Sequence, residues 1–296
     1  MIRELVVGLA ALAVVGSTGP TDSMEDAINA RIAVTPGAVV SVSYHDLQTG
    51  RRLDIAGDTV YHAASTMKIP VMIEVLRRAQ RGSFSLDQQV LLVNQFPSIA
   101  DGSPFSVDAG DDSDSTLYKS VGSRVAIREL LQRMVTRSSN LATNALIELV
   151  GATRVTQTAH SLGATRMSVL RGVEDQKAFD RGMVNTTTAA DLATLLAGIE
   201  QGAVLSRSSS NEMRDILLAQ EFNDKIPAGL PPGTRVAHKT GEITAVSHDA
   251  AVIYPPGRKP YVLVVLTKGI RDATASSALI ADISRIVWNH TVGAIQ

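Results

Sequence analysis

The sequence of 296 residues contains no cysteine. This absence excludes disulfide bonds, zinc sites with thiolate ligands and catalysis by a thiolate, and it fits either an oxidising or a reducing compartment. Aromatic residues make up only 4% of the chain, and the formal net charge is -1. Binding of nucleic acid needs a basic surface and is helped by aromatic side chains that stack on bases. Nucleic acid is therefore not an expected partner.

Long apolar runs are also scarce, and the one that stands out lies at the N-terminus. A single positive residue, Arg3, precedes an apolar run over residues 5–15, which small residues follow. Residues 1–20 thus resemble a secretory signal peptide, with a run too short to span a bilayer comfortably. The alternative is an apolar first helix. We expect a periplasmic or secreted protein without a stable membrane span in the mature chain.

The residues that could bind a metal, histidines and acidic residues, do not occur at the spacings of known metal sites. The histidines lack the spacing of a zinc site, which disfavours a zinc hydrolase, and we expect neither a metal nor another cofactor. Residues 94–123 are rich in Asp, Ser, Gly and Pro, and predict a long surface loop. The acidic residues of this loop lack the ligand pattern of a calcium loop, so they indicate a solvated face: Asp108, Asp111, Asp112 and Asp114.

The apolar residues, 45% of the chain, recur with the periods of helices and strands. The predicted helices cover residues 23–32, the stretch after residue 65, 123–134 with Ser123 as cap, 139–150, 153–161, 188–196, 208–219 and 273–289. The predicted strands cover residues 39–44, 52–55, 235–240, 248–254 and 261–267. Because strands from both chain ends flank a helical block, we expect an α+β fold in which one antiparallel sheet is covered by the terminal helices.

This arrangement divides the chain into two domains. We assign residues 23–63 and 205–296 to the domain that contains the sheet, and residues 64–204 to an inserted all-α domain. A loop over residues 171–185 lacks periodicity and belongs to the second domain. A cleft is expected between the domains, where binding pockets commonly form.

Ser65 and Lys68 are the first pair of residues that can carry chemistry. They lie three positions apart before an apolar helical stripe, so they share one side of the first turn. A lysine whose pKa is lowered can take the proton of a serine hydroxyl, and N-H groups at a helix start stabilise an oxyanion. Pro70 disfavours a regular helical turn before it, so this opening turn is expected to be tighter than an α-helix. The alternative is a capping serine with a solvated lysine.

A second hydroxyl and amide occur together at Ser138 and Asn140, at the start of another predicted helix. Ser138 can relay a proton to a leaving nitrogen, and Asn140 can hold a substrate amide. Asn144 lies on the same helical face as Asn140 and can brace the region. Helix capping by Ser138 or Ser139 explains the stretch equally well when it is taken alone.

The third stretch, Lys239-Thr240-Gly241-Glu242, lies on a predicted strand. Lysine and threonine together can anchor a substrate carboxylate by charge-assisted hydrogen bonds, and Gly241 permits close approach to the strand edge. The alternative is a solvated strand end.

Together, Ser-x-x-Lys, Ser-x-Asn and Lys-Thr-Gly resemble the three signatures of the penicillin-recognising serine hydrolases, and most closely those of the class A β-lactamases. The resemblance implies an α/β sandwich with a five-stranded antiparallel sheet plus an all-α domain. It makes Ser65 the acylated nucleophile, Lys68 its proton partner and Ser138 the proton shuttle. It makes substrate ligands of the following residues: Asn140, Lys239, Thr240, Gly241 and Glu242, the last through its main-chain N-H in the oxyanion hole.

The sequence departs from the class A pattern at four positions. Ser139 replaces the usual aspartate of the second motif, whose role in the family is mainly structural. Glu174 is the candidate base for release of the acyl group, although it is shifted by one residue from the usual Arg-x-Glu and can instead be an exposed loop acid. Asn185 stands where an aspartate would pair with Arg171. His248 stands where many relatives place a carboxylate-binding arginine; the alternative is a histidine packed beside Asp249.

These features predict a serine β-lactamase that opens the β-lactam ring through an acyl-enzyme on Ser65 and acts in antibiotic resistance. A β-lactam or a peptidoglycan-like molecule is the expected substrate, and a monomer is the expected state. The alternatives are a D-alanyl-D-alanine carboxypeptidase, a related serine esterase, or a penicillin-binding sensor that is acylated without turnover. Glutaminase shares the nucleophile motif but not the export pattern.

Overall fold

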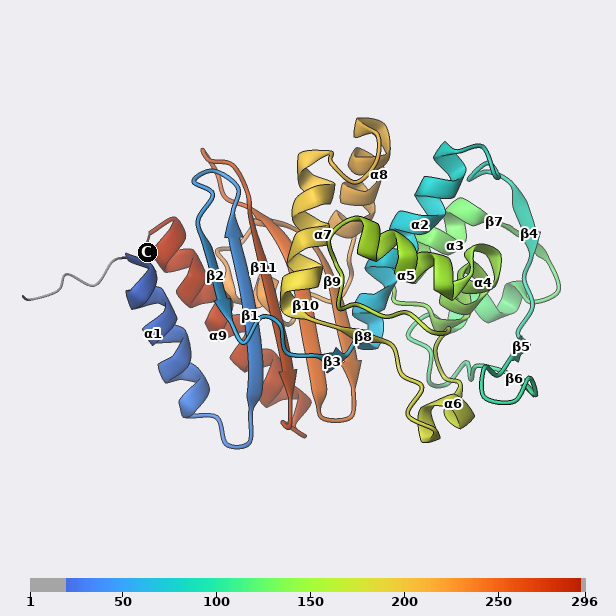
Figure 1. Cartoon of the computed structure of the whole chain (residues 1–296), viewed down its shortest axis with the longest axis horizontal. Coiled ribbons are helices and arrows are strands. Elements are labelled where there is room, and N and C mark those ends of the chain that lie inside the picture. Colours follow the sequence, from blue (N-terminus) through green and yellow to red (C-terminus); the bar gives the residue numbers. More distant parts are fainter. Residues whose placement is uncertain (1–19, 294–296) are drawn as a thin grey trace, which may run out of the picture.

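The computed structural model describes residues 20–293, so the predicted signal peptide falls outside the described residues except for Pro20, where α1 begins. The centre of the fold is a five-stranded antiparallel sheet in the order β2-β1-β11-β10-β9 (Figure 1). Its strands are β1 (Val39–Asp46), β2 (Arg52–Ile55), β9 (Arg235–Ile243), β10 (Val246–Tyr254) and β11 (Tyr261–Lys268). The expected sheet from both chain ends is thereby confirmed.

The pairing of β1 with β11 joins the two ends of the chain, with Val42 opposite Val265. Successive side chains of a strand point to opposite faces, and both faces of this sheet are covered. On one face, Leu263 and Val265 pack against the terminal helices α1 (Pro20–Ala33) and α9 (Ala273–Thr291) (Figure 1). On the other face, Val262 and Val264 pack against the helical block. Every residue of β11 except the last is therefore buried.

The helical block consists of α2 (Lys68–Gln80), α3 (Ile127–Thr136), α4 (Asn140–Val150), α5 (Ala152–Ser161), α7 (Ala189–Gln201) and α8 (Arg207–Leu218). One apolar core runs from the inner face of the sheet through these helices, with α7 directly on β1, β10 and β11. The Thr188 side chain caps α7 by accepting from the Asp191 N-H (3.0 Å). The prediction that Ser123 caps the next helix was wrong, because α3 begins after Ala126 without a side-chain cap.

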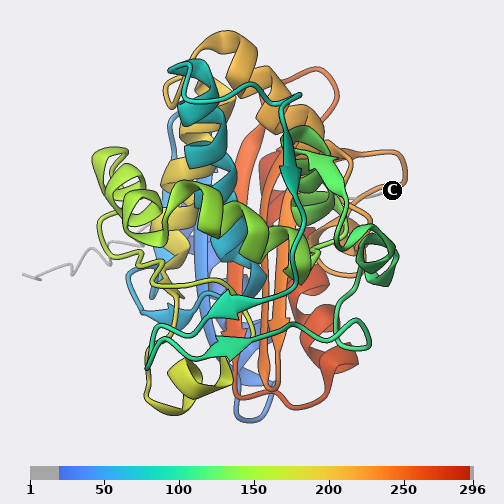
Figure 2. The same cartoon turned by 90° about the vertical axis from the view of Figure 1, so that its right-hand side faces the viewer.

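Short elements complete the chain. They are the strand pairs β3 (Tyr61–His62) with β8 (Thr186–Thr187), β4 (Gln89–Leu91) with β7 (Arg124–Ala126) and β5 (Phe96–Pro97) with β6 (Pro104–Phe105), the helix α6 (Gln176–Asp180), and the 3₁₀ helices η1 (Ala64–Met67), η2 (Ser115–Ser120) and η3 (Ile226–Gly229). The segment 94–123 thus contains β5, β6 and η2, and Figure 2 shows β5 and β6 close to α6. Among the described helices, none is both long and apolar enough to cross a bilayer.

The 3₁₀ helix η3 fixes the segment that follows α8 onto α9. Ser284 Oγ donates to the main-chain oxygen of Ile226 (2.9 Å), and Gly229 lies directly against α9. A Cβ atom added at Gly229 would lie 2.0 Å from the main-chain oxygen of Ala281. Only glycine therefore allows η3 to pack this closely on α9.

We predict that Gly229→Ala lowers the free energy of unfolding by about 3 kcal/mol, because the clash is with backbone and cannot be relieved by a side-chain rotation. For a chain of this length, that loss corresponds to a fall in Tm of roughly 5–10 °C, measurable by circular dichroism. Gly257→Ala is the matched control. Gly257 has a positive φ (+72°), unlike Gly229, so alanine there costs about 1 kcal/mol of backbone strain, but no atom lies within 4 Å of the added Cβ. Equal losses in the two variants would contradict the packing argument.

Candidate active site

Ser65 lies on η1, the 3₁₀ turn that opens into α2, which confirms the expected tighter turn. The preceding residue, Ala64, has φ +45°, a left-handed conformation that is strained for a residue with a Cβ. Neither η1 nor α2 has a side-chain cap, so Ser65 is not a capping serine. A Cβ added at Gly241 would lie 3.0 Å from the main-chain nitrogen of Ser65. Glycine therefore lets β9 approach the turn that carries Ser65.

The side chain of Lys68 is fully buried beside this turn. Its Nζ donates to the main-chain oxygen of Ser138 (2.6 Å), to Ser138 Oγ (3.0 Å) and to Asn140 Oδ1 (3.1 Å). The first and second sequence motifs thus meet through direct hydrogen bonds. Lys68 is not the solvated lysine of the alternative interpretation.

A second lysine, from the third motif, also donates a hydrogen bond to Ser138. Lys239, also fully buried, donates from Nζ to Ser138 Oγ (3.0 Å) and to the main-chain oxygen of Thr240 (2.9 Å). Because Ser138 Oγ accepts from both lysines, its own hydrogen is left to point elsewhere. Ser138 has φ +57°, a second strained backbone position at the site.

Burial of two lysines around one hydroxyl has an electrostatic consequence. Burial lowers the pKa of Lys68 to about 7, although the carboxylates of Asp112 and Glu174 oppose this shift. Burial and the nearby charge of Lys68 hold the pKa of Lys239 well below its ordinary value. Burial disfavours the charged amine, so a neutral Lys68 is accessible near neutral pH. That is the form that can accept a proton.

The start of α4 is organised by a carboxylate that the sequence did not identify. Asp112 is buried, and its Oδ2 accepts from the main-chain N-H groups of Asn140 and Leu141, both at 2.9 Å. Ser139 Oγ caps α4 by accepting from the Ala142 N-H (3.3 Å) and lies 3.4 Å from the same Asp112 oxygen. A carboxylate from the loop thus stands beside the position where class A relatives carry a motif aspartate.

The acidic loop therefore needs a correction. Asp108 and Asp111 are exposed as expected, but Asp112 and Asp114 are buried. Asp114 pairs with Arg133 (2.9 Å). Among the described residues, no group of three or more histidine, aspartate or glutamate side chains is arranged to hold a metal ion.

The loop 171–185 presents Glu174 to the same site. Asn144 braces this loop as one interpretation expected: its Nδ2 donates to the Val173 oxygen (3.0 Å), and its Oδ1 accepts from the Val173 N-H (2.7 Å). Gly172 fits closely here, since an added Cβ would lie 2.2 Å from Asn144 Oδ1. Glu174 itself has φ +62°. This backbone turn carries its carboxylate toward α4.

Glu174 is joined to the buried lysine through Asn140. Asn140 Nδ2 donates to Glu174 Oε1, while Asn140 Oδ1 accepts from Lys68 Nζ. The carboxylate opens onto the cleft, but the cleft walls remove part of its hydration and raise its pKa above the ordinary value. A glutamate with a raised pKa is a better proton acceptor than a solvated one. Glu174 is exposed, as the alternative expected, but its carboxylate lines the pocket beside Ser65 and is bound by Asn140.

Arg171 and Asn185 hold the loop without an ion pair. Asn185 Oδ1 accepts from the Leu170 (2.8 Å) and Arg171 (3.2 Å) N-H groups, and its Nδ2 donates to the Arg171 oxygen (3.0 Å). Arg171 Nε donates to the Met183 oxygen (2.9 Å). Amide-to-backbone bonds thus replace the ion pair that an aspartate would form. Asp175 adds a tether by accepting from Ser98 Oγ (2.8 Å).

Ser65 lies between two adjoining pockets. One is lined by residues of the turn and of the 171–185 loop, including His62, Ser65, Asn140, Glu174 and Glu242. The other is lined by Ser65, Ser138, Asn140, Lys225, Thr240, Gly241 and Glu242. The sequence did not identify Lys225 as a site residue. Its Nζ donates to Glu242 Oε2 (3.0 Å), and it places a cation beside Thr240.

His248 does not reach these pockets. It is fully buried in the sheet, where Nε2 lies 2.9 Å from the His62 oxygen, and Nδ1 lies 3.2 Å from the Thr267 nitrogen and 2.7 Å from the Ser247 oxygen. Burial lowers its pKa to about 4, which keeps the ring neutral. This position does not fit the expectation that His248 binds a substrate carboxylate. Nor does it pack as a partner of Asp249, which was the alternative.

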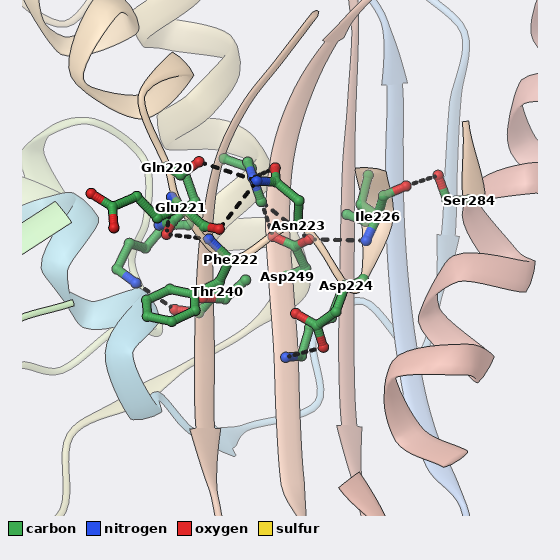
Figure 3. A network of polar contacts seen from close by, with 12 residues as sticks. Gln220, Glu221, Phe222, Asn223, Asp224, Ile226, Thr240, Asp249 and Ser284 are labelled. Atoms are coloured by element: carbon green, nitrogen blue, oxygen red, sulfur yellow. Dashed lines mark hydrogen bonds and ion pairs between the residues drawn. The ribbon is translucent and has the colours of Figure 1, made fainter. Parts of the chain in front are cut away.

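The histidine that pairs with Asp249 is His238, the neighbour of Lys239. His238 Nδ1 lies 3.0 Å from Asp249 Oδ1, and Asp249 Oδ2 accepts from the Ile226 N-H (3.0 Å). Both side chains are buried behind the third motif. Figure 3 shows this network continuing through Asn223 on one side and Ser284 on the other. It ties the segment that bears Lys225 to β9 and α9.

Comparison with known proteins agrees with this geometry. A sequence model described as the β-lactamase enzyme family matches residues 23–291. Beta-lactamase AST-1 of Nocardia asteroides is 30% identical over 272 residues, which cover 90% of this chain and 84% of the relative. A β-lactamase of Streptomyces albus G is 29% identical over 256 residues, covering 85% and 79%.

Solved structures agree as well. The structure of PBP-A superposes with a TM-score of 0.78 at 29% identity, covering 90% of this chain and 95% of PBP-A. The fold, the converging motifs and these similarities lead to one assignment. The chain belongs to the β-lactamase enzyme family and is a class A-like serine hydrolase.

Proposed function

We propose that the protein hydrolyses β-lactams through an acyl-enzyme on Ser65. The observation that carries the proposal is the convergence of Lys68 and Lys239 on Ser138 Oγ beside Ser65. Asn140 links this centre to Glu174. Ser65 lines both adjoining pockets, Ser138 lines one and Glu174 the other, and Lys68 is buried next to Ser138. A nucleophile, a proton shuttle and two candidate bases are thus grouped as two-step acyl transfer requires.

In the acylation step, Ser65 Oγ attacks the lactam carbonyl carbon and its proton passes to neutral Lys68. The main-chain N-H groups of Ser65 and Glu242 stabilise the oxyanion that forms. The carbon-nitrogen bond then breaks, and Ser138 gives its hydroxyl proton to the leaving nitrogen. Lys68 returns a proton to Ser138 across their 3.0 Å hydrogen bond. The products of this step are the ester on Ser65 and a secondary amine within the same molecule.

In the deacylation step, Glu174 takes a proton from a water molecule that attacks the ester carbonyl. Ser65 leaves with a proton, and the ring-opened acid departs. The raised pKa of Glu174 suits this task, and the hydrogen bond from Asn140 holds the carboxylate in place. Glu174 as a base therefore decides whether the acyl-enzyme is hydrolysed or persists. Without it, the protein would behave as a penicillin-binding sensor.

The pocket lined by Thr240 and Lys225 would receive the substrate carboxylate. Lys239 lies behind Thr240, and Lys225 adds a cation on the open side. These groups support an anionic β-lactam as substrate, with a peptidoglycan-like peptide as the alternative. Antibiotic resistance is the biological role that such turnover would serve.

Two further proposals concern the protein's setting. The apolar run at residues 5–15 supports export to the periplasm or the exterior, which N-terminal sequencing of protein from cell fractions would test. We also propose a monomer, which light scattering would test.

We predict that intact-mass spectrometry with a penicillin detects a transient adduct on the wild-type protein while the drug is consumed. Ser65→Ala should form no adduct, and its rate of drug hydrolysis should fall by roughly a thousandfold or more, because the nucleophile is gone. A persistent adduct would instead indicate a sensor. A carboxypeptidase would release D-alanine from a peptide without consuming penicillin. If the wild-type protein forms no adduct and consumes no drug, the proposal is refuted.

We predict that Glu174→Gln slows deacylation roughly 10²- to 10⁴-fold, because glutamine cannot take the proton of water. The acyl-enzyme should then accumulate, while its formation persists. Asp180→Asn is the matched control, since Asp180 is an exposed acid of the same loop that bonds only Gln176. It should turn over like the wild type. Unchanged turnover in Glu174→Gln would show that Glu174 is not the base.

We predict that the acylation rate depends on the protonation of Lys68. With a pKa of about 7, Lys68 is neutral above this pH and charged below it, so the rate should rise through pH 7 and level off above. Below pH 7 it should fall about tenfold per pH unit. Stopped-flow acylation of Glu174→Gln by a fluorescent penicillin isolates this effect from the Glu174 carboxyl. Because the charge of Glu174 raises the pKa of Lys68, the midpoint of this variant should lie below that of the native protein. A flat profile between pH 5.5 and 8.5 would contradict the role of Lys68.

A further inference from the structure

The strained turn before Ser65 is held by a hydrogen bond from the side chain of His62. The Ala64 N-H donates to His62 Nδ1 (3.0 Å), two residues back along the chain. Ala64 has φ +45°, so the backbone would relax toward an ordinary conformation unless its surroundings fixed it. The contact is made one residue before the nucleophile. It therefore bears directly on where Ser65 Oγ lies.

The backbone of His62 is held in turn by His248. In the neutral tautomer that carries its hydrogen on Nε2, His248 donates to the His62 oxygen (2.9 Å) and its Nδ1 accepts from the Thr267 N-H (3.2 Å) of β11. The His248 ring is fully buried and packs edge-on against Tyr61 at 5.7 Å between centroids. The sheet thus fixes the main chain of His62 through one imidazole, and His62 fixes Ala64 through a second.

We propose that His62 and His248 are positioning residues for the nucleophile, and that acylation requires the neutral imidazole of His62 with its Nδ1 as hydrogen-bond acceptor. The inference rests on the proposed role of Ser65. It goes beyond that role, because neither histidine touches the reacting atoms.

The chemistry of imidazole makes this contact sensitive to pH. In the neutral ring, Nδ1 accepts from Ala64 and the hydrogen lies on Nε2. A protonated ring carries hydrogens on both nitrogens, so its Nδ1-H would face the Ala64 N-H and the bond would be lost.

Burial and one nearby cation favour the neutral form of His62. Burial and the positive charge of Arg171 lower the pKa of His62. The neutral His248 lies beneath it, and the ring of Phe179 packs against it at 6.1 Å. The acidic residues that line the same pocket would favour the charged ring, but they do not reverse the direction of the shift: Asp111, Glu174, Asp175 and Glu242. At neutral pH the imidazole is therefore ready to accept from Ala64.

The test compares two substitutions of equal shape. An asparagine at this position can accept from the N-H two residues on, as in an Asx turn, whereas a leucine cannot. Acylation by a fluorescent penicillin is measured at pH 8 in His62→Asn and His62→Leu, with circular dichroism to verify folding. We expect the leucine variant to be acylated at least tenfold more slowly than the asparagine variant. Equal rates in two folded variants would overturn the proposal.

The pH profile gives a second readout that needs no leucine variant. In the Glu174→Gln variant with native His62, we plot the logarithm of the acylation rate against pH. Just below pH 7 the slope should be near one, because Lys68 is being protonated. The slope should approach two at lower pH, where His62 is protonated as well. With His62→Asn added, the slope should stay near one. A slope that is the same with histidine and asparagine would overturn the inference.

The controls separate this inference from the proposed function. If the protein with native His62 is acylated and Ser65→Ala is not, the proposed function stands whatever the His62 variants do. If the native protein is not acylated at all, both proposals fall together.

Discussion

The structure depends on one interaction: two buried lysines donate to the same serine hydroxyl. Lys68 comes from the first helix of the helical block, Lys239 from an edge strand of the sheet, and Ser138 from the turn before α4. Each buried amine would be costly to charge alone, and the proximity of the two makes double ionisation costlier still. The packing of the sheet against the helices therefore creates the lowered pKa of Lys68 on which the proposed proton transfer from Ser65 depends.

Backbone strain is concentrated at the same place. Among the described residues, five without glycine's freedom have a positive φ, and three of them are Ala64, Ser138 and Glu174. Strained residues persist only where their surroundings hold them, and each of these has such a hold. Ala64 bonds His62, Ser138 bonds both lysines, and the residue before Glu174 is clamped by Asn144. The strain thus serves to aim the side chains that the chemistry uses.

Much of this could be predicted from the sequence, because the decisive patterns are local. The periods of apolar residues predicted the sheet and most helices, and the spacing of three short motifs predicted the groups that converge. What escaped prediction depends on contacts between distant segments. Asp112 was expected in solvent, yet the loop folds it onto the start of α4. His248 was expected at the substrate, yet its strand register buries the ring beneath His62. The order of residues alone predicts neither placement, because each depends on contacts between segments that are distant in the sequence.

The departure at Glu174 shows how a shift in sequence can be absorbed in space. One extra residue between Arg171 and Glu174 would turn the carboxylate away if the loop kept an ordinary backbone. Instead, Asn144 binds both polar groups of Val173, Gly172 leaves room for that amide, and the positive φ of Glu174 reverses the direction of the chain. The carboxylate then meets Asn140, which also contacts Lys68. A motif read by spacing alone would reject Glu174, whereas the hydrogen bonds that position it support its role as a base.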